Sequence, residues 1–435
     1  MTDTAAVVPS SDTHETPTRR EAVRAFTKIG LLSFGGPAAQ ISLMHQILVT
    51  EKGWLSERQY LSALSFCMLL PGPEAMQLAT YAGWRLHGLV GGLMAGLLFV
   101  LPGAAIVLAL AATYAMVGDL PLVTTLFLGV KAAVLIIVIE ALLRVARRAL
   151  KGTAHWMIAG LAFAGIFFLD LPFPVIILLA ALFGLARGNP GSGGPAEPGA
   201  IGTTVGRTAG TVLIWLTLWW LPVLLLHMSA SPAVLADISL FFSKLATVTF
   251  GGAYAVLAYM AQAVVADFHW LDAGEMMDGL GLAETTPGPL ILVTEFVGFL
   301  AAYREGGVGL GIAGAAVTLW VTFAPCFLWI FAGAPYIDWI SAQPRLSGAL
   351  AAITAAVVGV ILNLSLWFGL HVLFTSVTLR TYGPLQLWQP DLASIDWNVV
   401  ALSVLCAYLL LRRHWNIAVV LLASSALGWM LVTFR

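Results

Sequence analysis

The sequence is poor in charged residues and in cysteine. Only 10% of its 435 residues are Asp, Glu, Lys or Arg, whereas 60% are hydrophobic, and its mean hydropathy is +0.92. Because these few polar side chains could not cover the surface of a water-soluble protein of this size, we expect a membrane protein.

The three cysteines give no sign of a disulfide or a metal site. Cys67, Cys326 and Cys406 lie in apolar stretches and form no CxxC or Cys/His pattern. Neither a disulfide framework nor a zinc site is therefore expected.

Sequence motifs of enzymes are also missing. The chain has no HExxH, no Asp-rich metal motif, no P-loop and no GxSxG, so we expect no catalytic residues, no metal and no cofactor. A net charge of -1 and the lack of a basic aromatic surface give no reason to expect nucleic acid as a partner. A membrane-embedded enzyme acting on a lipid phosphate stays as an alternative from another class, because helix N-termini would serve its substrate too.

Long apolar runs predict an all-α polytopic membrane protein. Runs of about 18 or more residues, long enough for a hydrocarbon core of roughly 30 Å, occur at 90–117, 121–141, 212–228, 307–334 and 346–377. Shorter runs at 156–168, 173–186, 399–411 and 417–431 predict short or tilted spans. Residues 1–20, rich in Thr, Ser, Pro and Glu, predict a disordered tail and no cleaved signal, and the Gly- and Pro-rich residues 188–206 predict a flexible linker.

The chain contains an internal repeat. The segments "FTKIGLLSFGGPA" from Phe26, "WLSERQ" and "LPGP" recur as "FSKLATVTFGGAY" from Phe242, "WLDAGE" and "TPGP", at a constant offset of 216 residues (242 minus 26). The repeat predicts two homologous halves, 21–187 and 236–435, with one extra transmembrane helix at 207–230 between them. Matching helix starts are predicted from two capping boxes, Ser56 with Gln59 and Asp272 with Glu275.

Charge predicts that the two halves have opposite orientations. Lys52 and Arg58 flank the first Trp motif, whereas Asp267, Asp272 and Glu275 flank the second. The positive-inside rule then puts equivalent positions on opposite sides, and the basic residues at 19–24 put the N-terminus in the cytoplasm. Such an inverted repeat is typical of secondary transporters, whose substrate sites lie near the midplane between the halves.

Glycine and proline interrupt the apolar segments at matching places. The breaks are Phe34-Gly35-Gly36-Pro37 and Pro71-Gly72-Pro73 in the first half, and Phe250-Gly251-Gly252 and Pro287-Gly288-Pro289 in the second. Because Pro removes a backbone donor and Gly loosens the turn, each segment is predicted to be two half-helices, either a re-entrant hairpin or a broken span. Pro37, Pro73 and Pro289 are predicted to start half-helices whose free N–H groups and positive ends form an anion site. The alternative is that the breaks only kink helices for packing.

Polar residues stand near these breaks. Lys28 and Lys244 each precede a break phenylalanine by six positions and are predicted to help bind the anion, unless they snorkel to the interface. Gln77, Thr285 and Thr286 would supply neutral hydrogen bonds. Glu74 and Glu284 adjoin the Pro-Gly-Pro breaks, and because burial disfavours a charged carboxylate, either could carry a proton in exchange for the anion. Glu74 could instead be only a helix cap. The pair Glu140 and Arg144, four residues apart, is interpreted as largely self-neutralising.

At "SFGGPAAQI", "CMLLPGPEAMQLATYAGW", "TFGGAYAVLAY" and "GLAETTPGPLILVTEFVGF" the sequence resembles the chromate ion transporter family in its long two-domain form. The resemblance extends from about residue 24 onward. It implies a secondary active transporter that exports chromate across the bacterial inner membrane, coupled to the proton gradient, and so confers chromate resistance. The resemblance also implies that the positions matching the family's functional motifs are Phe34, Gly35, Gly36, Pro71, Gly72, Pro73, Phe250, Gly251, Gly252, Pro287, Gly288 and Pro289.

The partners expected from this resemblance are chromate, protons and the lipid bilayer. Sulfate is expected to compete, because it is a tetrahedral dianion of similar size. A carrier for sulfate or another oxyanion, and a passive anion channel, are the alternatives within the transport class. Association into a homodimer stays open.

Overall fold

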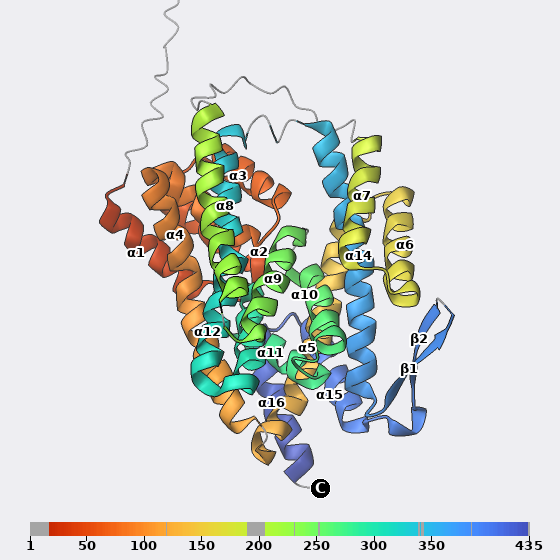
Figure 1. The fold of residues 1–435 in the computed structure, drawn as a ribbon. Helices are drawn as coiled ribbons and strands as arrows, with labels where there is room; N and C mark the ends of the chain where they lie inside the picture. Colours follow the sequence, from red (N-terminus) through yellow and green to blue (C-terminus); the bar gives the residue numbers. More distant parts are fainter. Residues whose placement is uncertain are drawn as a thin grey trace, which may run out of the picture.

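The computed structural model describes residues 17–118, 120–188, 205–229, 231–250, 253–337, 340, 343–383 and 385–433. Residues 1–16 of the predicted tail and 189–204 of the predicted linker lie outside these ranges. The described part is almost entirely helical (Figure 1), which confirms the predicted all-α class. Five helices are long and apolar enough to cross a membrane, and each overlaps one of the predicted long runs.

The helices occur in two series with the same order. The first series comprises α1 (Arg19–Leu32), α2 (Gly36–His45), α3 (Glu57–Leu69), α4 (Glu74–Val117), α5 (Pro121–Ala149), α6 (Thr153–Leu169) and α7 (Phe173–Arg187). After α8 (Val205–Met228), the second comprises α9 (Ala233–Val248), α10 (Ala253–Gln262), α11 (Ala273–Thr285), α12 (Val293–Gly333), α14 (Pro344–Leu373), α15 (Trp397–Ala407) and α16 (Ile417–Thr433).

Short segments complete these series. The π-helical turns Gln46–Glu51, Ala263–Asp267 and Tyr408–Arg412 continue α2, α10 and α15, and 3-10 turns occur at Leu290–Leu292, Ala334–Tyr336 and Leu392–Ser394. Strands β1 (Val377–Tyr382) and β2 (Leu385–Pro390) form an antiparallel hairpin with Val377 opposite Pro390. The predicted apolar run at 346–377 was therefore too long as a helix, since α14 ends at Leu373 and β1 begins at Val377.

Both predicted capping boxes are present and start equivalent helices. The N–H of Gln59 donates to Ser56 Oγ at 3.3 Å, and the Gln59 side chain accepts from the N–H of Ser56 at 3.1 Å. In the second half, Asp272 and Glu275 make the same reciprocal bonds at 2.8 and 2.9 Å. Because the boxes satisfy N–H groups that no helix carbonyl can reach, α3 and α11 begin where the sequence predicts.

Each of the two longest helices is a pair of antiparallel arms joined at a glycine. α4 turns at His87–Gly88, where Gly88 has φ of 63°, and α12 turns at Gly306–Gly307, where Gly307 has φ of 72°. Glycine permits these turns because residues with a side chain rarely adopt positive φ. The arms then pack so closely that a Cβ on Gly83 would collide with the carbonyl oxygen of Gly91.

The Phe-Gly-Gly segments fold as helical hairpins, which is the shape that the first of the two alternatives requires. Lys28 of α1 lies 3.8 Å from Glu51, which follows the far end of α2. In the second half, the ring of Phe241 in α9 lies 5.8 Å from that of Trp270, beyond α10. A continuous helix rising 1.5 Å per residue would hold either pair tens of ångströms apart. The chain therefore doubles back at each break.

The two halves pack across each other in a reciprocal way. α14 packs against α6 and α7 of the first half, and its counterpart α5 packs against α15 and α16 of the second. α4 and α12 contact each other. In Figure 1, α7 lies at the upper end of the molecule and its counterpart α16 lies at the lower end, beside the C-terminus. This is the arrangement that an inverted repeat would produce.

Candidate oxyanion site

The break tips of the two halves are joined by backbone hydrogen bonds. The N–H of Gly72 donates to the carbonyl oxygen of Thr249 at 2.8 Å, and the N–H of Gly288 donates to that of Ser33 at 2.9 Å. Each bond links the Pro-Gly-Pro tip of one half to the residue before the Phe-Gly-Gly break of the other. Gly72 and Gly288 have φ of 119° and 96°, values that favour glycine. The halves are therefore linked at the breaks themselves.

Buried polar side chains support these tips. Ser33 Oγ donates to the carbonyl of Ile29 and Thr249 Oγ1 donates to that of Leu245, both at 2.6 Å. Gln40 Nε2 donates to the carbonyl of Gly288 at 2.6 Å, and Gln77 Nε2 donates to that of Pro71 at 2.7 Å. Because carbonyls freed by a break need donors when buried, these bonds hold the irregular backbone in place.

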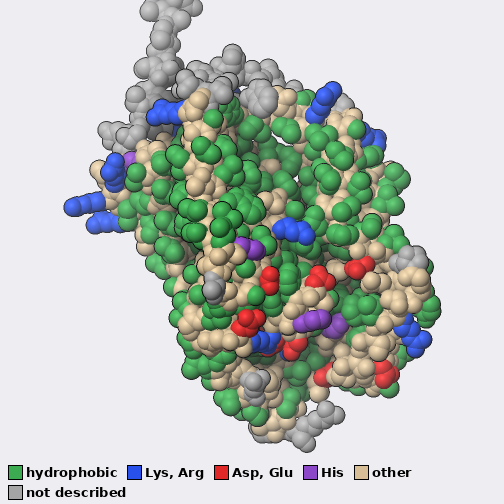
Figure 2. Space-filling view, in the orientation of Figure 1, with side chains coloured by type: hydrophobic (Ala, Val, Ile, Leu, Met, Phe, Trp, Pro, Cys, Tyr) green, Lys and Arg blue, Asp and Glu red, His purple; other side chains and the backbone are tan. Residues whose placement is uncertain are grey.

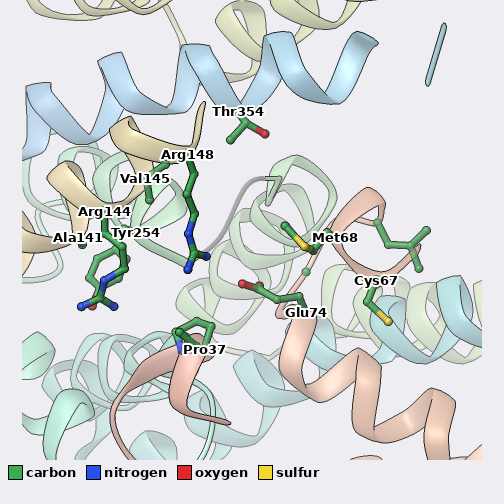
Figure 3. Close-up of a pocket in the computed structure, with 13 residues that line it drawn as sticks. Pro37, Cys67, Met68, Glu74, Ala141, Arg144, Val145, Arg148, Tyr254 and Thr354 are labelled. Carbon is green, nitrogen blue, oxygen red and sulfur yellow. The ribbon is translucent and has the colours of Figure 1, made fainter. Parts of the chain in front are cut away.

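A pocket lies beside the tips of the first half (Figure 3). Its volume is about 170 Å³, several times the roughly 30 Å³ that one water occupies in the liquid. Both halves contribute to its lining, which consists of Pro37, Ala38, Cys67, Met68, Leu70, Gly72, Glu74, Ala141, Arg144, Val145, Arg148, Tyr254 and Thr354.

Two arginines of α5 supply positive charge to this pocket. Arg144 and Arg148 are four residues apart, so they share a helix face. Figure 3 shows Arg148 extending from α5 on the side of Glu74 and Pro37. Arg144 is paired with Glu140 at 2.6 Å, whereas Arg148 has no ion pair among the residues that the structure describes. Since guanidinium groups bind oxyanions through paired N–H donors, Arg148 is the available cation.

Two helix N-termini without side-chain caps border the same pocket. α2 begins at Gly36, with Pro37 in its first turn, and α4 begins at Glu74. First-turn N–H groups without an internal partner, together with the positive end of the helix dipole, favour a bound anion. Pro37 lies in the first turn as predicted, whereas Pro73 and Pro289 are cap residues, one position before the helical turns that follow them.

Glu284 is connected to the pocket through Tyr254. The Glu284 side chain is 7% exposed, and its Oε1 accepts a hydrogen bond of 2.7 Å from the hydroxyl of Tyr254, which lines the pocket. Arg144 lines the same pocket as Tyr254. The half-buried Glu74 lines the pocket directly. Both carboxyls proposed as proton carriers are thus placed at or next to one site.

Other residues named from the sequence lie outside the pocket lining. Lys28 is exposed near Glu51, and Lys244 Nζ lies 5.5 Å from the ring centre of Tyr259. The hydroxyls of Thr285 and Thr286 donate to the carbonyls of Leu282 and Ala283. A bound oxyanion would therefore compete with these carbonyls for the two hydroxyl donors. Phe34, Gly35, Gly36, Pro71, Pro73, Gln77, Phe250, Pro287, Gly288 and Pro289 belong to the tips or adjoin them. Gly251 and Gly252 lie outside the described residues.

Sequence reasoning undervalued α5 and missed Tyr254. Arg144 was interpreted as largely neutralised by Glu140, and Arg148 was given no role. The available signal was their spacing of four residues, which puts two cations on one face of an apolar helix. Tyr254 adjoins the second Phe-Gly-Gly break, but its hydrogen bond to Glu284 spans 30 residues and depends on the hairpin fold.

The fold and the site define a polytopic membrane protein with two similar series of helices and a pocket lined by two arginines beside the joined tips of its helical hairpins. A family model described as "Chromate transporter" matches residues 20–185 and 236–429, which covers both halves and leaves out α8. The chain belongs to the chromate transporter family. No solved structure matches it.

Several curated relatives match most of the chain. A protein of Synechococcus elongatus named "Probable chromate transport protein" is 31% identical over 352 residues, which is 80% of this chain and 84% of that protein. A chromate transport protein of Cupriavidus metallidurans is 30% identical over 81% of this chain and 83% of its own length. One of Pseudomonas aeruginosa is 29% identical over 93% of this chain and 90% of its own length.

Proposed function

We propose that the chain is a secondary active transporter that exports chromate across the bacterial inner membrane and so confers chromate resistance. The pocket beside the joined tips carries this proposal, because it places Arg144, Arg148 and two uncapped helix N-termini around a space for a small oxyanion. A dehydrated dianion needs several charge-assisted donors at once, and these groups supply them. The names of the relatives favour chromate as the dianion. Sulfate, similar in size and charge, is expected to compete.

The export direction is proposed from the distribution of charge. Arg19, Arg20 and Arg24 are exposed on α1. Figure 2 shows Lys and Arg side chains but no Asp or Glu at the upper end of this face, and Asp and Glu side chains together with some Lys and Arg in its lower half. The positive-inside rule assigns the upper end and the N-terminus to the cytoplasm. An inside-negative potential then favours outward movement of a dianion by about 4.6 kcal/mol per 100 mV, twice the value for one charge.

Coupling to the proton gradient is proposed to run through Glu284. The buried carboxyl of Glu284 accepts a hydrogen bond from Tyr254, which lines the anion pocket. Binding or release of a proton by this carboxyl therefore changes the charge beside the pocket. Glu74 is the second candidate. Lys28 and Lys244 are proposed to raise anion affinity through their field, since they do not line the pocket. Gln77, Thr285 and Thr286 are proposed to hydrogen-bond the oxyanion by exchanging their present carbonyl partners for it.

Uptake of labelled chromate and labelled sulfate into everted inner-membrane vesicles tests this proposal. We expect saturable chromate uptake that sulfate inhibits and that an acidic vesicle interior stimulates, because the everted interior corresponds to the outside of the cell. A rate of chromate uptake that does not change with the pH gradient would indicate a passive channel. Faster transport of sulfate than of chromate would indicate a sulfate carrier, and no uptake of either anion by folded protein would refute oxyanion transport.

A further inference from the structure

A second cavity lies between α6, α7 and α14, at the edge where Figure 1 shows α6 and α7 beside α14. Its volume is about 410 Å³, and its polar lining includes Thr153, His155 and Arg187. It shares no residue with the oxyanion pocket. The transport proposal therefore does not account for it.

An apolar groove continues from this cavity. The groove has a volume of about 240 Å³ and runs between α6 and α7, with Met157, Leu161 and Leu179 in its wall. Ala154, Ile158 and Phe183 line both the cavity and the groove, so the two spaces are contiguous. α6 and α7 each pack along α14 and touch each other little, which leaves the groove between them. Its wall stays open to the surroundings, since Leu161 is 73% exposed.

The cavity has the chemistry of a phosphate site. Arg187, at the end of α7, supplies a cation, and its guanidinium lies 6.0 Å from the ring centre of Phe183. The 17-residue α6 begins at Thr153 without a side-chain cap, and its N–H groups first find a backbone acceptor at His155, which donates to the carbonyl of Gly152 at 3.0 Å, so those of Thr153 and Ala154 point out of the helix end. His155 Nδ1 is shielded from solvent and has no hydrogen-bond partner in the part of the chain that the structure describes. Together these groups offer one full positive charge and several donors.

We propose that the cavity and the groove together bind one anionic phospholipid. The phosphate group lies against Arg187 and the start of α6, and an acyl chain fills the groove between α6 and α7. The continuity of a basic cavity with an apolar groove selects an amphiphile, and the cation selects an anionic head group. A free phosphate would use the cavity alone and leave the groove empty. The bound lipid adds contacts between α6 and α7, which otherwise touch each other little.

Lipid binding to the purified full-length protein tests this proposal. Native mass spectrometry in detergent is used with phosphatidylglycerol, phosphatidylcholine and inorganic phosphate as separate probes. We expect phosphatidylglycerol to bind at least about tenfold more tightly than phosphatidylcholine, and Arg187→Gln to weaken phosphatidylglycerol binding by about tenfold or more, as the loss of a charge-assisted contact implies. Arg187→Lys should restore part of the affinity. Arg147→Gln is the matched control, because Arg147 is exposed and lies outside the cavity.

A second variant separates a lipid from a soluble phosphate. Leu179→Trp places a larger ring in the wall of the groove and outside the cavity lining, so it should weaken phosphatidylglycerol binding and leave phosphate binding unchanged. This variant also tests the proposal if the Arg187→Gln protein fails to fold. Equal affinity for the two lipids, equal effects of Arg187→Gln and Arg147→Gln, or phosphate binding as tight as phosphatidylglycerol binding would overturn the proposal. Since no step measures transport, the result stands apart from the proposed function.

Discussion

Replacing Arg148 by Gln is expected to weaken chromate binding more than the same change at Arg144. Both side chains line the oxyanion pocket, but Arg144 is paired with Glu140 at 2.6 Å. Arg148 has no ion pair in the described part of the chain. When Glu74, which lines the same pocket, carries a proton, the full charge of Arg148 acts on a bound dianion, whereas the charge of Arg144 is partly offset by Glu140.

Coulomb's law gives the size of this difference. With an effective dielectric constant of about 20, a dianion about 4 Å from a guanidinium is attracted by about 8 kcal/mol. At Arg144, the carboxylate of Glu140 about 6 Å from the dianion repels it by about 5.5 kcal/mol, which leaves about 3 kcal/mol. Desolvation reduces the net loss of a charge-assisted contact to about 1.5–3 kcal/mol. The apparent KM should therefore rise about 10- to 150-fold for Arg148→Gln and less than about tenfold for Arg144→Gln.

Initial rates of chromate uptake into everted vesicles, at constant ionic strength, measure these KM values. Glu140→Gln provides a test of opposite sign, because it removes the carboxylate that offsets Arg144 and should lower KM. Arg147→Gln is the matched control on the same helix, exposed and outside the pocket lining. If Arg148→Gln and Arg147→Gln give the same KM, or if Glu140→Gln raises it, the assigned pocket does not bind the anion.

Three further predictions address topology, coupling and the tips. Cysteines placed at Lys52 and Phe268, exposed positions 216 residues apart, should react differently with an impermeant thiol reagent from outside a cysteine-free protein; equal labelling would contradict the inversion. Glu284→Gln should still bind chromate but lose the response of uptake to the pH gradient, and Glu284→Ala should impair both because Tyr254 loses its acceptor; unchanged gradient-driven transport by the Gln variant would move the proton to Glu74. Gly288→Ala, at φ of 96°, should lower the free energy of unfolding by about 1–3 kcal/mol. Gly160→Ala, with open space around the new Cβ, should not lower it, and equal Tm values in detergent would refute the strain at the tip.

Local sequence patterns were sufficient for the helices and the breaks. Apolar runs correspond to the membrane-crossing helices, because a span must be apolar over its whole length. Ser56 and Asp272 mark helix starts because a capping box acts within four residues. The repeat placed Gly72 and Gly288 at equivalent breaks, since glycine and proline alter the backbone wherever they occur.

Only the tertiary structure decided what these breaks contact and which side chains surround the site. The bonds from Gly72 to Thr249 and from Gly288 to Ser33 join residues in different halves, and no local signal specifies such a pairing. Arg148 reaches the pocket because α5 packs beside the tips, although 74 residues of sequence separate it from Glu74 (148 minus 74). Hydropathy and capping act over a few residues, whereas the charge that an anion experiences depends on distances in space. The sequence by itself therefore determined the class of protein and the irregular backbone, and the packing of the two halves determined the composition of the pocket.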